Sequence, residues 1–227
     1  MSKTSGPAGP APRVWDLPTR LAHWLLVVLV PFSWWSATNH HLAWHRLSGY
    51  AVLVIIVFRL TWGVVGSDTA RFAQFVRGPR AALAYLRGQF GTVVGHNPLG
   101  GWSIVAMLAV LATQVGLGLF AVDEDGLDPS PLAKFVDFDT GRLIAKAHHL
   151  NFKLLLGLIG LHLAAITVYA ARGRNLVWPM VVGRGDVGVG PPAVRFTPLW
   201  IAVLVVLVAA GLAWFVAGGL SLRLPKG

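Results

Sequence analysis

Long apolar stretches, separated by short polar or basic segments, dominate this chain. Five of them approach or exceed the roughly 20 residues that an α-helix needs to cross the hydrocarbon core of a bilayer. They cover residues 19–37, 46–65, 99–121, 143–170 and 197–218. Inside a bilayer the backbone must satisfy its own hydrogen bonds, which helices do within one segment. The pattern therefore predicts an all-α integral membrane protein.

The polar stretches between these spans divide the chain further. Residues 1–12 are rich in Pro, Gly and Ser and are predicted to be a disordered tail. Residues 70–87 are amphipathic, and Gly78-Pro79 should break them into two short helices lying at the membrane interface. We expect a four-helix domain over 13–185, followed over 186–227 by a linker, a fifth transmembrane helix and a short tail.

Composition supports the membrane class and excludes others. Charged residues make up 12% of the chain, about half the usual share of a soluble domain. The net charge of +10 comes from basic residues that lie between the spans, which argues against nucleic-acid binding. Cysteine is absent, so disulfides, cysteine-ligated iron–sulfur clusters and covalently attached c-type haem are excluded.

The loop charges predict an orientation. Arginines and lysines precede the first span and follow the second and fourth spans. Six of the nine acids lie between the third and fourth spans: Asp123, Glu124, Asp125, Asp128, Asp137 and Asp139. The positive-inside rule then places the N-terminus in the cytoplasm and, with five spans, the C-terminus outside. We interpret the first span as a retained helix rather than a signal peptide, because Asp16 and Pro18 interrupt its basic flank.

Histidines carry the candidate chemistry, since a histidine within a span should face the bundle interior and mark function. The eight are His23, His40, His41, His45, His96, His148, His149 and His162. His23 opens the first span on the cytoplasmic side, and His45 opens the second on the outer side. His148 lies near the outer end of the fourth span, and His162 is 14 residues further along.

Depth and angle select four of them. Fourteen residues correspond to about 21 Å along a helix and bring His162 within roughly 40° of His148, whereas His149 points about 140° away from His162. We therefore predict two pairs, His23 with His162 and His45 with His148. His40 and His41 are interpreted as residues of a brief outer loop, and His96 as part of the helix start at Asn97-Pro98.

Two imidazoles facing each other inside a helical bundle are what a six-coordinate haem iron needs. The two pairs predict two non-covalent haems stacked about 20 Å apart, suited to electron transfer. Arg46 and Arg59 could contact haem propionates or could instead extend to the interface. Five glycines could make room for the macrocycles or serve close helix packing, namely Gly49, Gly116, Gly118, Gly157 and Gly160.

Several ordered motifs resemble a known family. They are VWDLPTRLAHW at 14–24, HRLSGY at 45–50, FRLTWG at 58–63, GHNPLGG at 95–101 and the His148–His162 pair. Across roughly residues 13–185 the chain resembles the bacterial cytochrome b-561 family, which includes the cytochrome b subunit of nickel–iron hydrogenases. The resemblance implies a four-helix core with two b haems, ligated from the first, second and fourth spans, and quinone-linked electron transfer in the bacterial cytoplasmic membrane. The fifth span lies beyond this core.

The leading hypothesis is a dihaem b-type cytochrome that transfers electrons across the membrane between a quinone and a redox partner. That partner would be a hydrogenase-type enzyme or a cytochrome c; whether the chain is itself an enzyme stays open. One alternative is a haem oxidoreductase acting directly on a small substrate such as superoxide. A more remote alternative is a metal-ion transporter using His41, His45, His148 and His149, which the scarcity of acids within the spans disfavours.

Overall fold

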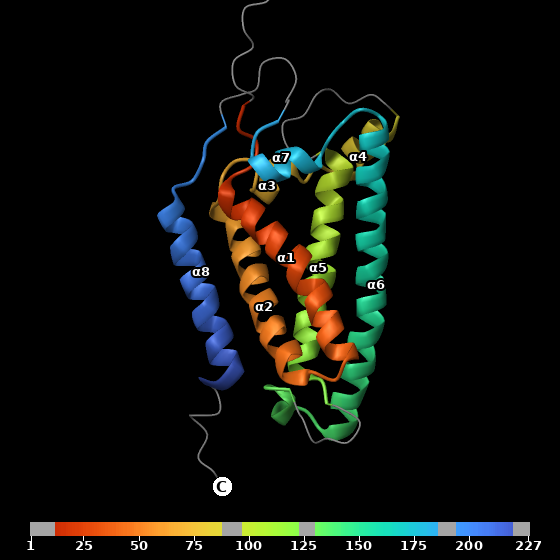
Figure 1. The fold of residues 1–227 in the computed structure, drawn as a ribbon, viewed down its shortest axis with the longest axis vertical. Coiled ribbons are helices and arrows are strands. Elements are labelled where there is room, and N and C mark those ends of the chain that lie inside the picture. The colour runs from red at the N-terminus through yellow and green to blue at the C-terminus, as the bar shows by residue number, and fades with distance from the viewer. Residues whose placement is uncertain (1–11, 88–96, 123–129, 186–193, 220–227) are drawn as a thin grey trace, which may run out of the picture.

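Five long helices, arranged side by side, make up most of the computed structural model, which describes residues 12–87, 97–122, 130–185 and 194–219 (Figure 1). All five are long and apolar enough to cross a membrane. The long helices are α1 (Leu17–Thr38), α2 (Leu42–Val65), α5 (Pro98–Phe120), α6 (Phe138–Ala171) and α8 (Leu199–Trp214), the last continued by a π-helix over Phe215–Gly219. The five predicted spans and the all-α class are confirmed, and no strand occurs in the described residues.

Helix α6 begins five residues earlier than the hydropathy pattern predicts. Asp137 caps it, because its carboxylate accepts the backbone N–H of Thr140 at 2.9 Å. This hydrogen bond lowers the pKa of the Asp137 carboxyl. Polar residues of the first turns therefore extend the helix beyond its apolar part, which a hydropathy window alone cannot detect.

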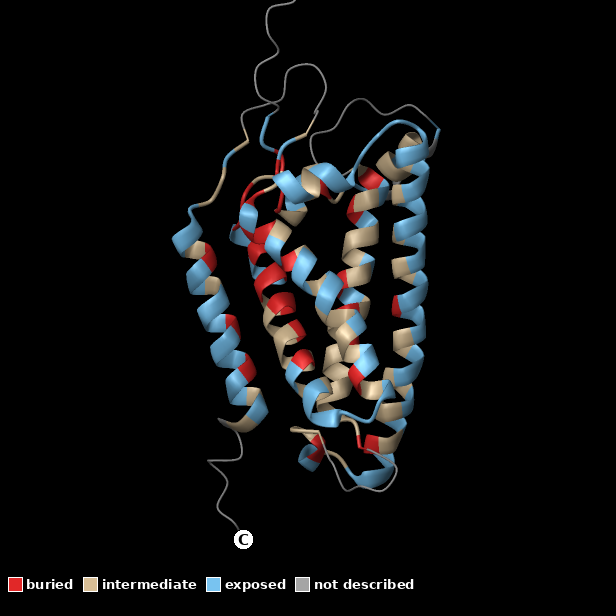
Figure 2. Ribbon diagram, viewed as in Figure 1, coloured by how far each residue is buried: buried red, intermediate tan, exposed pale blue. Residues whose placement is uncertain are grey.

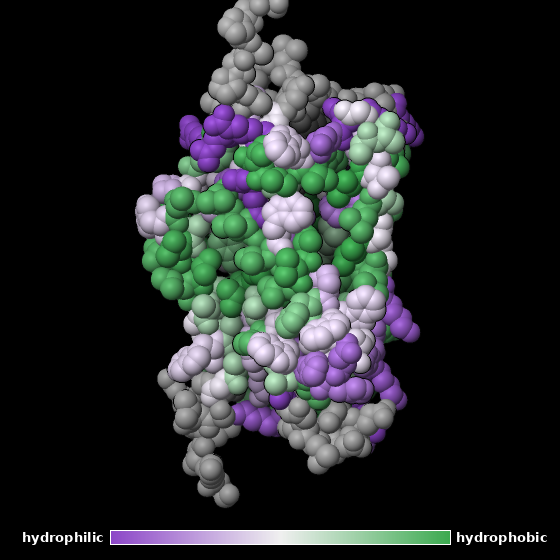
Figure 3. Space-filling model, viewed as in Figure 1, coloured by the Kyte–Doolittle hydropathy of each residue, from purple (hydrophilic) through white to green (hydrophobic). Residues whose placement is uncertain are grey.

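The helices pack in two pairs bridged by α2. Helix α1 packs along α2, α5 packs along α6, and α2 also contacts α5 and α8. Buried residues accordingly concentrate on α2 (Figure 2). Apolar side chains cover the middle of the outer surface (Figure 3), among them Leu161 and Val208, which are 65% and 71% exposed. A surface of this kind is suited to lipid rather than water.

Short helices gather at the end of the bundle where α1 begins (Figure 1). Helices α3 (Phe72–Phe75) and α4 (Pro79–Leu86) are separated at Gly78, as the sequence predicts. A third, α7 (Val177–Val182), was not predicted. The hydroxyl of Tyr85 on α4 lies 2.6 Å from that of Tyr169 on α6. Burial and then this hydrogen bond raise the pKa of Tyr85 to about 12.

A buried polar contact joins α1 to α2 at the same end. Asp16 accepts the Thr19 N–H at 2.8 Å and, with its other oxygen, the Trp62 indole N–H at 2.9 Å. Both Asp16 and Trp62 are buried, at 4% and 0% exposure. The chain before α1 is also paired with the chain after α7, because Val14 N–H donates to the Gly183 carbonyl at 2.8 Å. These contacts fix the direction in which α1 enters the bundle.

Helix α8 packs along α2, at the edge of the bundle. Its own small residues Ala202, Ala209 and Ala213 are buried. The segment before it is tied to the loop after α2. Asp68 accepts the backbone N–H of Arg195 at 2.9 Å, and this bond is the largest cause of the lowered pKa of Asp68. The fifth helix is therefore attached beside the other four helices, along α2.

Several expectations lie outside the described residues. These are the conformation of residues 1–11, the environment of His96, the acids at positions 123, 124, 125 and 128, and the linker over 186–193. The membrane orientation stays a prediction.

Candidate functional site

Two histidine pairs face into the bundle, one near each end. His45 lies in the first turn of α2 and faces His148 of α6, with ring centres 6.1 Å apart and ring planes at 90°. His23 lies in the second turn of α1 and faces His162 of α6, at 6.4 Å and 62°. We call these the outer pair and the inner pair, after the sides of the membrane that the loop charges predict. The structure thus brings together the four histidines, and the pairing, that the sequence predicts.

The ring spacing fits a metal ion between the two imidazoles of each pair. Two metal–nitrogen bonds of about 2 Å, with ring centres roughly 1 Å beyond each nitrogen, place axial imidazole centres about 6 Å apart. Both measured distances agree with this value. A direct hydrogen bond between the two rings explains neither spacing, because no His–His hydrogen bond occurs in the described residues. The residues present therefore fit bis-histidine ligation of haem iron.

Backbone carbonyls orient both rings of the outer pair. The Nδ1–H of His45 donates to the Ser33 carbonyl at 2.9 Å, with the Ser33 hydroxyl 3.1 Å away. The Nδ1–H of His148 donates to the Gln114 carbonyl at 2.9 Å. A hydrogen bond at one ring nitrogen fixes which nitrogen keeps its lone pair. At both outer rings Nε2 is therefore the nitrogen whose lone pair is available to ligate a metal.

An amide network surrounds His148. The side-chain amide nitrogen of Gln114 lies 3.0 Å from His148 Nε2, and the amide oxygen of Gln114 accepts from Asn151 at 2.8 Å. Asn151 also donates to the Val110 carbonyl at 3.0 Å. This network joins α5 to α6 at the level of the outer pair. Binding of iron at Nε2 would displace the Gln114 amide from that nitrogen.

The inner pair lacks comparable hydrogen bonds. His23 Nδ1 is buried without a partner, and in the described part of the chain no group hydrogen-bonds a ring nitrogen of His162. The Trp24 ring contacts the edge of the His23 ring, at 5.0 Å between centres. Among the residues that the structure describes, the inner rings are therefore positioned by packing rather than by hydrogen bonds to their ring nitrogens.

The five glycines named as candidates for making room near the histidines differ in how much space surrounds them. A Cβ added at Gly49 or Gly116 would meet no atom within 4 Å, so neither residue serves close helix packing. A Cβ at Gly118 would lie 3.0 Å from Cε1 and 3.3 Å from Nδ1 of His148. Gly118 therefore lets the His148 ring approach the Gln114 carbonyl.

The remaining two glycines do not line the interior. Gly157 and Gly160 are exposed, with no atom within 4 Å of an added Cβ. At about 100° per residue, Gly157 points about 180° away from His148, and Gly160 about 160° away from His162. Their suggested role in making room for a macrocycle is therefore wrong, because they lie on the opposite face of α6 from the histidines.

An apolar layer separates the two pairs. Leu155 lies midway along α6, seven residues from His148 and seven from His162, and is 3% exposed. It packs in one cluster with Val52 and Ile56 of α2 and Leu111 of α5, and Leu26, Leu29 and Val30 of α1 pack against that cluster. All four helices of the bundle thus meet between the pairs through hydrocarbon side chains.

The two arginines expected near propionates have different surroundings. The Arg59 guanidinium donates to the Ala70 carbonyl at 3.1 Å and lies over the Phe72 ring, and the residue is 7% exposed. Arg46 is half-buried in the first turn of α2, beside His45. A propionate contact stays a prediction for both residues.

The other described histidines, His40, His41 and His149, form no additional centre. His40 and His41 are exposed in the turn between α1 and α2, where the His41 ring packs on Trp35. His149 is exposed next to His148. In the described part of the chain no three residues of the types His, Asp or Glu gather as metal ligands. This arrangement gives no support to the metal-transporter alternative.

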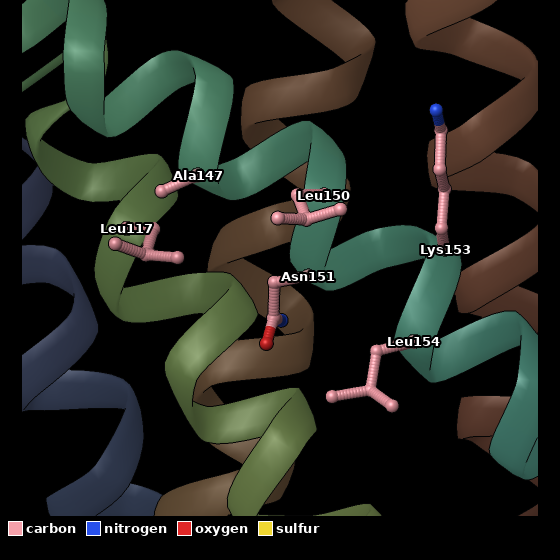
Figure 4. Close-up of a pocket in the computed structure, with 6 residues that line it drawn as sticks. All are labelled: Leu117, Ala147, Leu150, Asn151, Lys153 and Leu154. Carbon is pink, nitrogen blue, oxygen red and sulfur yellow. The ribbon is translucent and has the colours of Figure 1, made fainter.

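A groove of about 560 Å³ opens between α5 and α6 (Figure 4). Its walls are Leu117, Ala147, Leu150 and Leu154, with Asn151 and Lys153 as its polar residues. Asn151 points toward α5 and belongs to the amide network of His148. Through Asn151 and Gln114, a chain of side-chain contacts therefore leads from the groove to His148.

Sequence reasoning missed Ser33, Gln114 and Asn151. Polar side chains are rare in membrane spans because they are costly there. Gln114 and Asn151 are amides inside two of the predicted spans. Their polar character within an apolar segment alone could have marked them as candidate functional residues. The role of Ser33 depends on its backbone carbonyl, which no sequence signal reveals.

Comparison with known families gives one match. A family model described as prokaryotic cytochrome b561 matches residues 14–183. Neither a curated protein nor a solved structure matches the chain. The matched region includes both histidine pairs and ends before the segment that leads to α8.

Proposed function

The chain belongs to the prokaryotic cytochrome b561 family and is thus a membrane b-type cytochrome of electron transfer, and we propose that it binds two haems and carries electrons across the membrane. The observation that supports two haems is the presence of two histidine pairs with ring centres 6.1 and 6.4 Å apart. His45 and His148 would hold the outer haem iron, and His23 and His162 the inner one. Each haem would supply a one-electron redox centre.

The protein's own residues position these centres and exclude water from them. Because α6 contributes one ligand to each pair, a single helix fixes the separation, about 21 Å for 14 residues. The Ser33 and Gln114 carbonyls orient the outer rings. The Leu155 cluster fills the space between the pairs with hydrocarbon. A histidine from each side would leave no open position on the iron, so the four histidines favour electron transfer over direct chemistry on superoxide.

We further propose a quinone as the lipid-soluble partner and a hydrogenase-type enzyme or a cytochrome c as the protein partner. The groove between α5 and α6 supports a quinone, since it offers apolar walls and an amide near the outer pair. Pockets of about 300–1,000 Å³ are typical of small-molecule sites. The N-terminus would lie in the cytoplasm and the C-terminus in the periplasm, as the basic loops indicate.

A reduced-minus-oxidised absorption spectrum, with haem quantified per chain, tests the central proposal. We expect two low-spin b haems per folded chain. One haem per chain would refute the two-centre arrangement, and a colourless folded protein would refute the proposal as a whole.

A groove-filling variant tests the quinone. Ala147→Trp should slow haem reduction by a short-chain quinol while leaving the dithionite-reduced spectrum unchanged. Leu161→Trp, on an exposed part of α6 away from the groove, is the matched control. Equal rates in the two variants would place quinone binding elsewhere.

A further inference from the structure

The outer and inner pairs differ in what their imidazole N–H groups meet. Both outer rings donate Nδ1–H to a carbonyl at 2.9 Å, one on α1 and one on α5. In the inner pair His23 Nδ1 is buried without a partner. A ligating imidazole that donates its other N–H to a carbonyl becomes a more basic ligand. A more basic ligand stabilises ferric over ferrous iron and lowers the reduction potential.

Nearby arginines do not reverse this difference. Each site has one arginine close in sequence to a ligand on the same helix, Arg20 three residues before His23 and Arg46 directly after His45. The Arg20 guanidinium is bonded to the Val181 carbonyl of α7. Because each pair has an arginine close to it in the sequence, the carbonyl contacts are the feature that distinguishes the two sites most clearly.

We propose that the carbonyls of Ser33 and Gln114, with Gly118 giving His148 access, are positioning groups that make the outer haem the lower-potential centre of the two. This rests on the proposed function, because it requires haem in both sites. Gly118 contributes to the arrangement, since a Cβ there would lie 3.0 Å from the His148 ring. The ring would then have to shift by a few tenths of an ångström, which would strain its hydrogen bond to the Gln114 carbonyl.

Potentiometric titration of the intact membrane protein tests the order of the potentials. The wild-type chain should show two midpoints. His148→Ala removes the outer ligand, and the midpoint that remains belongs to the inner haem. We expect the remaining midpoint to be the higher of the two. An outer midpoint that equals or exceeds the inner one would overturn the proposal, whereas a chain without haem would instead refute the proposed function.

Gly118→Ala tests the cause of that order. The added methyl group should displace the His148 ring by a few tenths of an ångström and weaken its hydrogen bond to the Gln114 carbonyl. A tenfold change in the preference for ferric iron corresponds to about 59 mV for one electron, so the outer midpoint should rise by up to this amount while the inner one stays unchanged. Gly157→Ala is the matched control, because Gly157 is exposed on the face of α6 opposite the histidines and its Cβ would meet no atom within 4 Å.

Equal shifts in the two glycine variants would overturn the role of Gly118, as would a shift confined to the inner midpoint. Should Gly118→Ala lose the outer haem, the order of the wild-type midpoints still decides the proposal. Resonance Raman spectra give an independent readout. The iron–imidazole vibration of the outer haem should lie at higher frequency than that of the inner haem, and Gly118→Ala should lower it.

Discussion

The outer and inner histidine pairs have nearly the same ring spacing, 6.1 and 6.4 Å, but are positioned by different means. At the outer pair, hydrogen bonds to the Ser33 and Gln114 carbonyls fix each ring. At the inner pair, the rings are oriented by packing, and the nearby polar contacts join helices rather than ligands, as Asp16 does with Trp62.

This difference teaches that the distance between the two rings of a pair and the basicity of those rings as ligands are set by separate features. Spacing follows from where the histidines lie along helices that pack at fixed distance. Basicity follows from contacts at the second ring nitrogen. One bundle can therefore hold two centres of the same ligand type with different properties.

The largest expected effect is the loss of one haem and tests whether the pairs are independent. His148→Ala removes an axial ligand of the outer pair, so one haem per chain should remain, with the spectrum of the inner site. His149→Ala is the control, because His149 is exposed and points away from the interior. Haem quantified per chain and low-temperature spectra measure both. Loss of haem in His149→Ala with retention in His148→Ala would reverse the ligand assignment.

Removing the Asp16–Trp62 hydrogen bond should weaken the inner site selectively. Trp62→Phe leaves a buried carboxylate oxygen without this partner, a change that typically costs about 1–3 kcal/mol. In the wild-type chain the Trp62 ring stacks on Phe58 with 5.5 Å between ring centres. The phenylalanine ring should keep this stacking. In thermal denaturation followed by haem absorption, the inner haem should be released at a lower temperature than in the wild-type chain. Equal destabilisation of both haems would show that the two ends are coupled.

Breaking the amide network should have a smaller effect at the other end. Gln114→Leu removes the side-chain hydrogen bond with Asn151 but keeps the backbone carbonyl that orients His148. Interhelical hydrogen bonds in membranes contribute about 0.6–2 kcal/mol. When the protein is diluted, the fraction of chains that keep the outer haem should therefore fall several-fold. The reduction midpoint of the outer haem should shift less than in Gly118→Ala. Thr167→Val, which removes an exposed hydroxyl bonded only within α6, is the control.

The smallest expected effect is that of a substitution at Asp68, which belongs to neither histidine pair. It shows how much a change away from both pairs affects stability. Asp68 has a lowered pKa in the folded protein, chiefly because it accepts the Arg195 N–H. Its contribution to stability is therefore fully present above the unfolded pKa of about 3.9 and is lost as pH falls through the lower folded value. Because Asp68 is partly exposed and solvent screens its charge, Asp68→Asn should cost at most about 1 kcal/mol at neutral pH. The melting temperatures of variant and wild type should converge below pH 4, and both haem midpoints should stay unchanged.

The sequence predicted the spans and the histidine pairing because both depend on local regularities. Apolar length identifies a span, and a 14-residue interval on one helix fixes depth and direction together. The carbonyl contacts of His45 and His148 could not be predicted in this way, because they depend on how α1 and α5 pack against the ligands. Gly157 and Gly160 show the converse error: small residues near a ligand in sequence were interpreted as lining the site, although the helical angle turns them outward. Helix α7, six residues long, is too short to give a periodic signal.

The Leu155 layer has a consequence for what can cross the bundle. Protons move along chains of water or titratable groups, and close-packed hydrocarbon offers neither. Electrons need no such chain and can tunnel between two centres held on opposite sides of the layer. Each electron that passes between the proposed haems would therefore leave its proton behind and transfer one net charge across the apolar core. Electron transfer through a bundle of this design would therefore store part of the energy of the redox reaction as a transmembrane electrical potential.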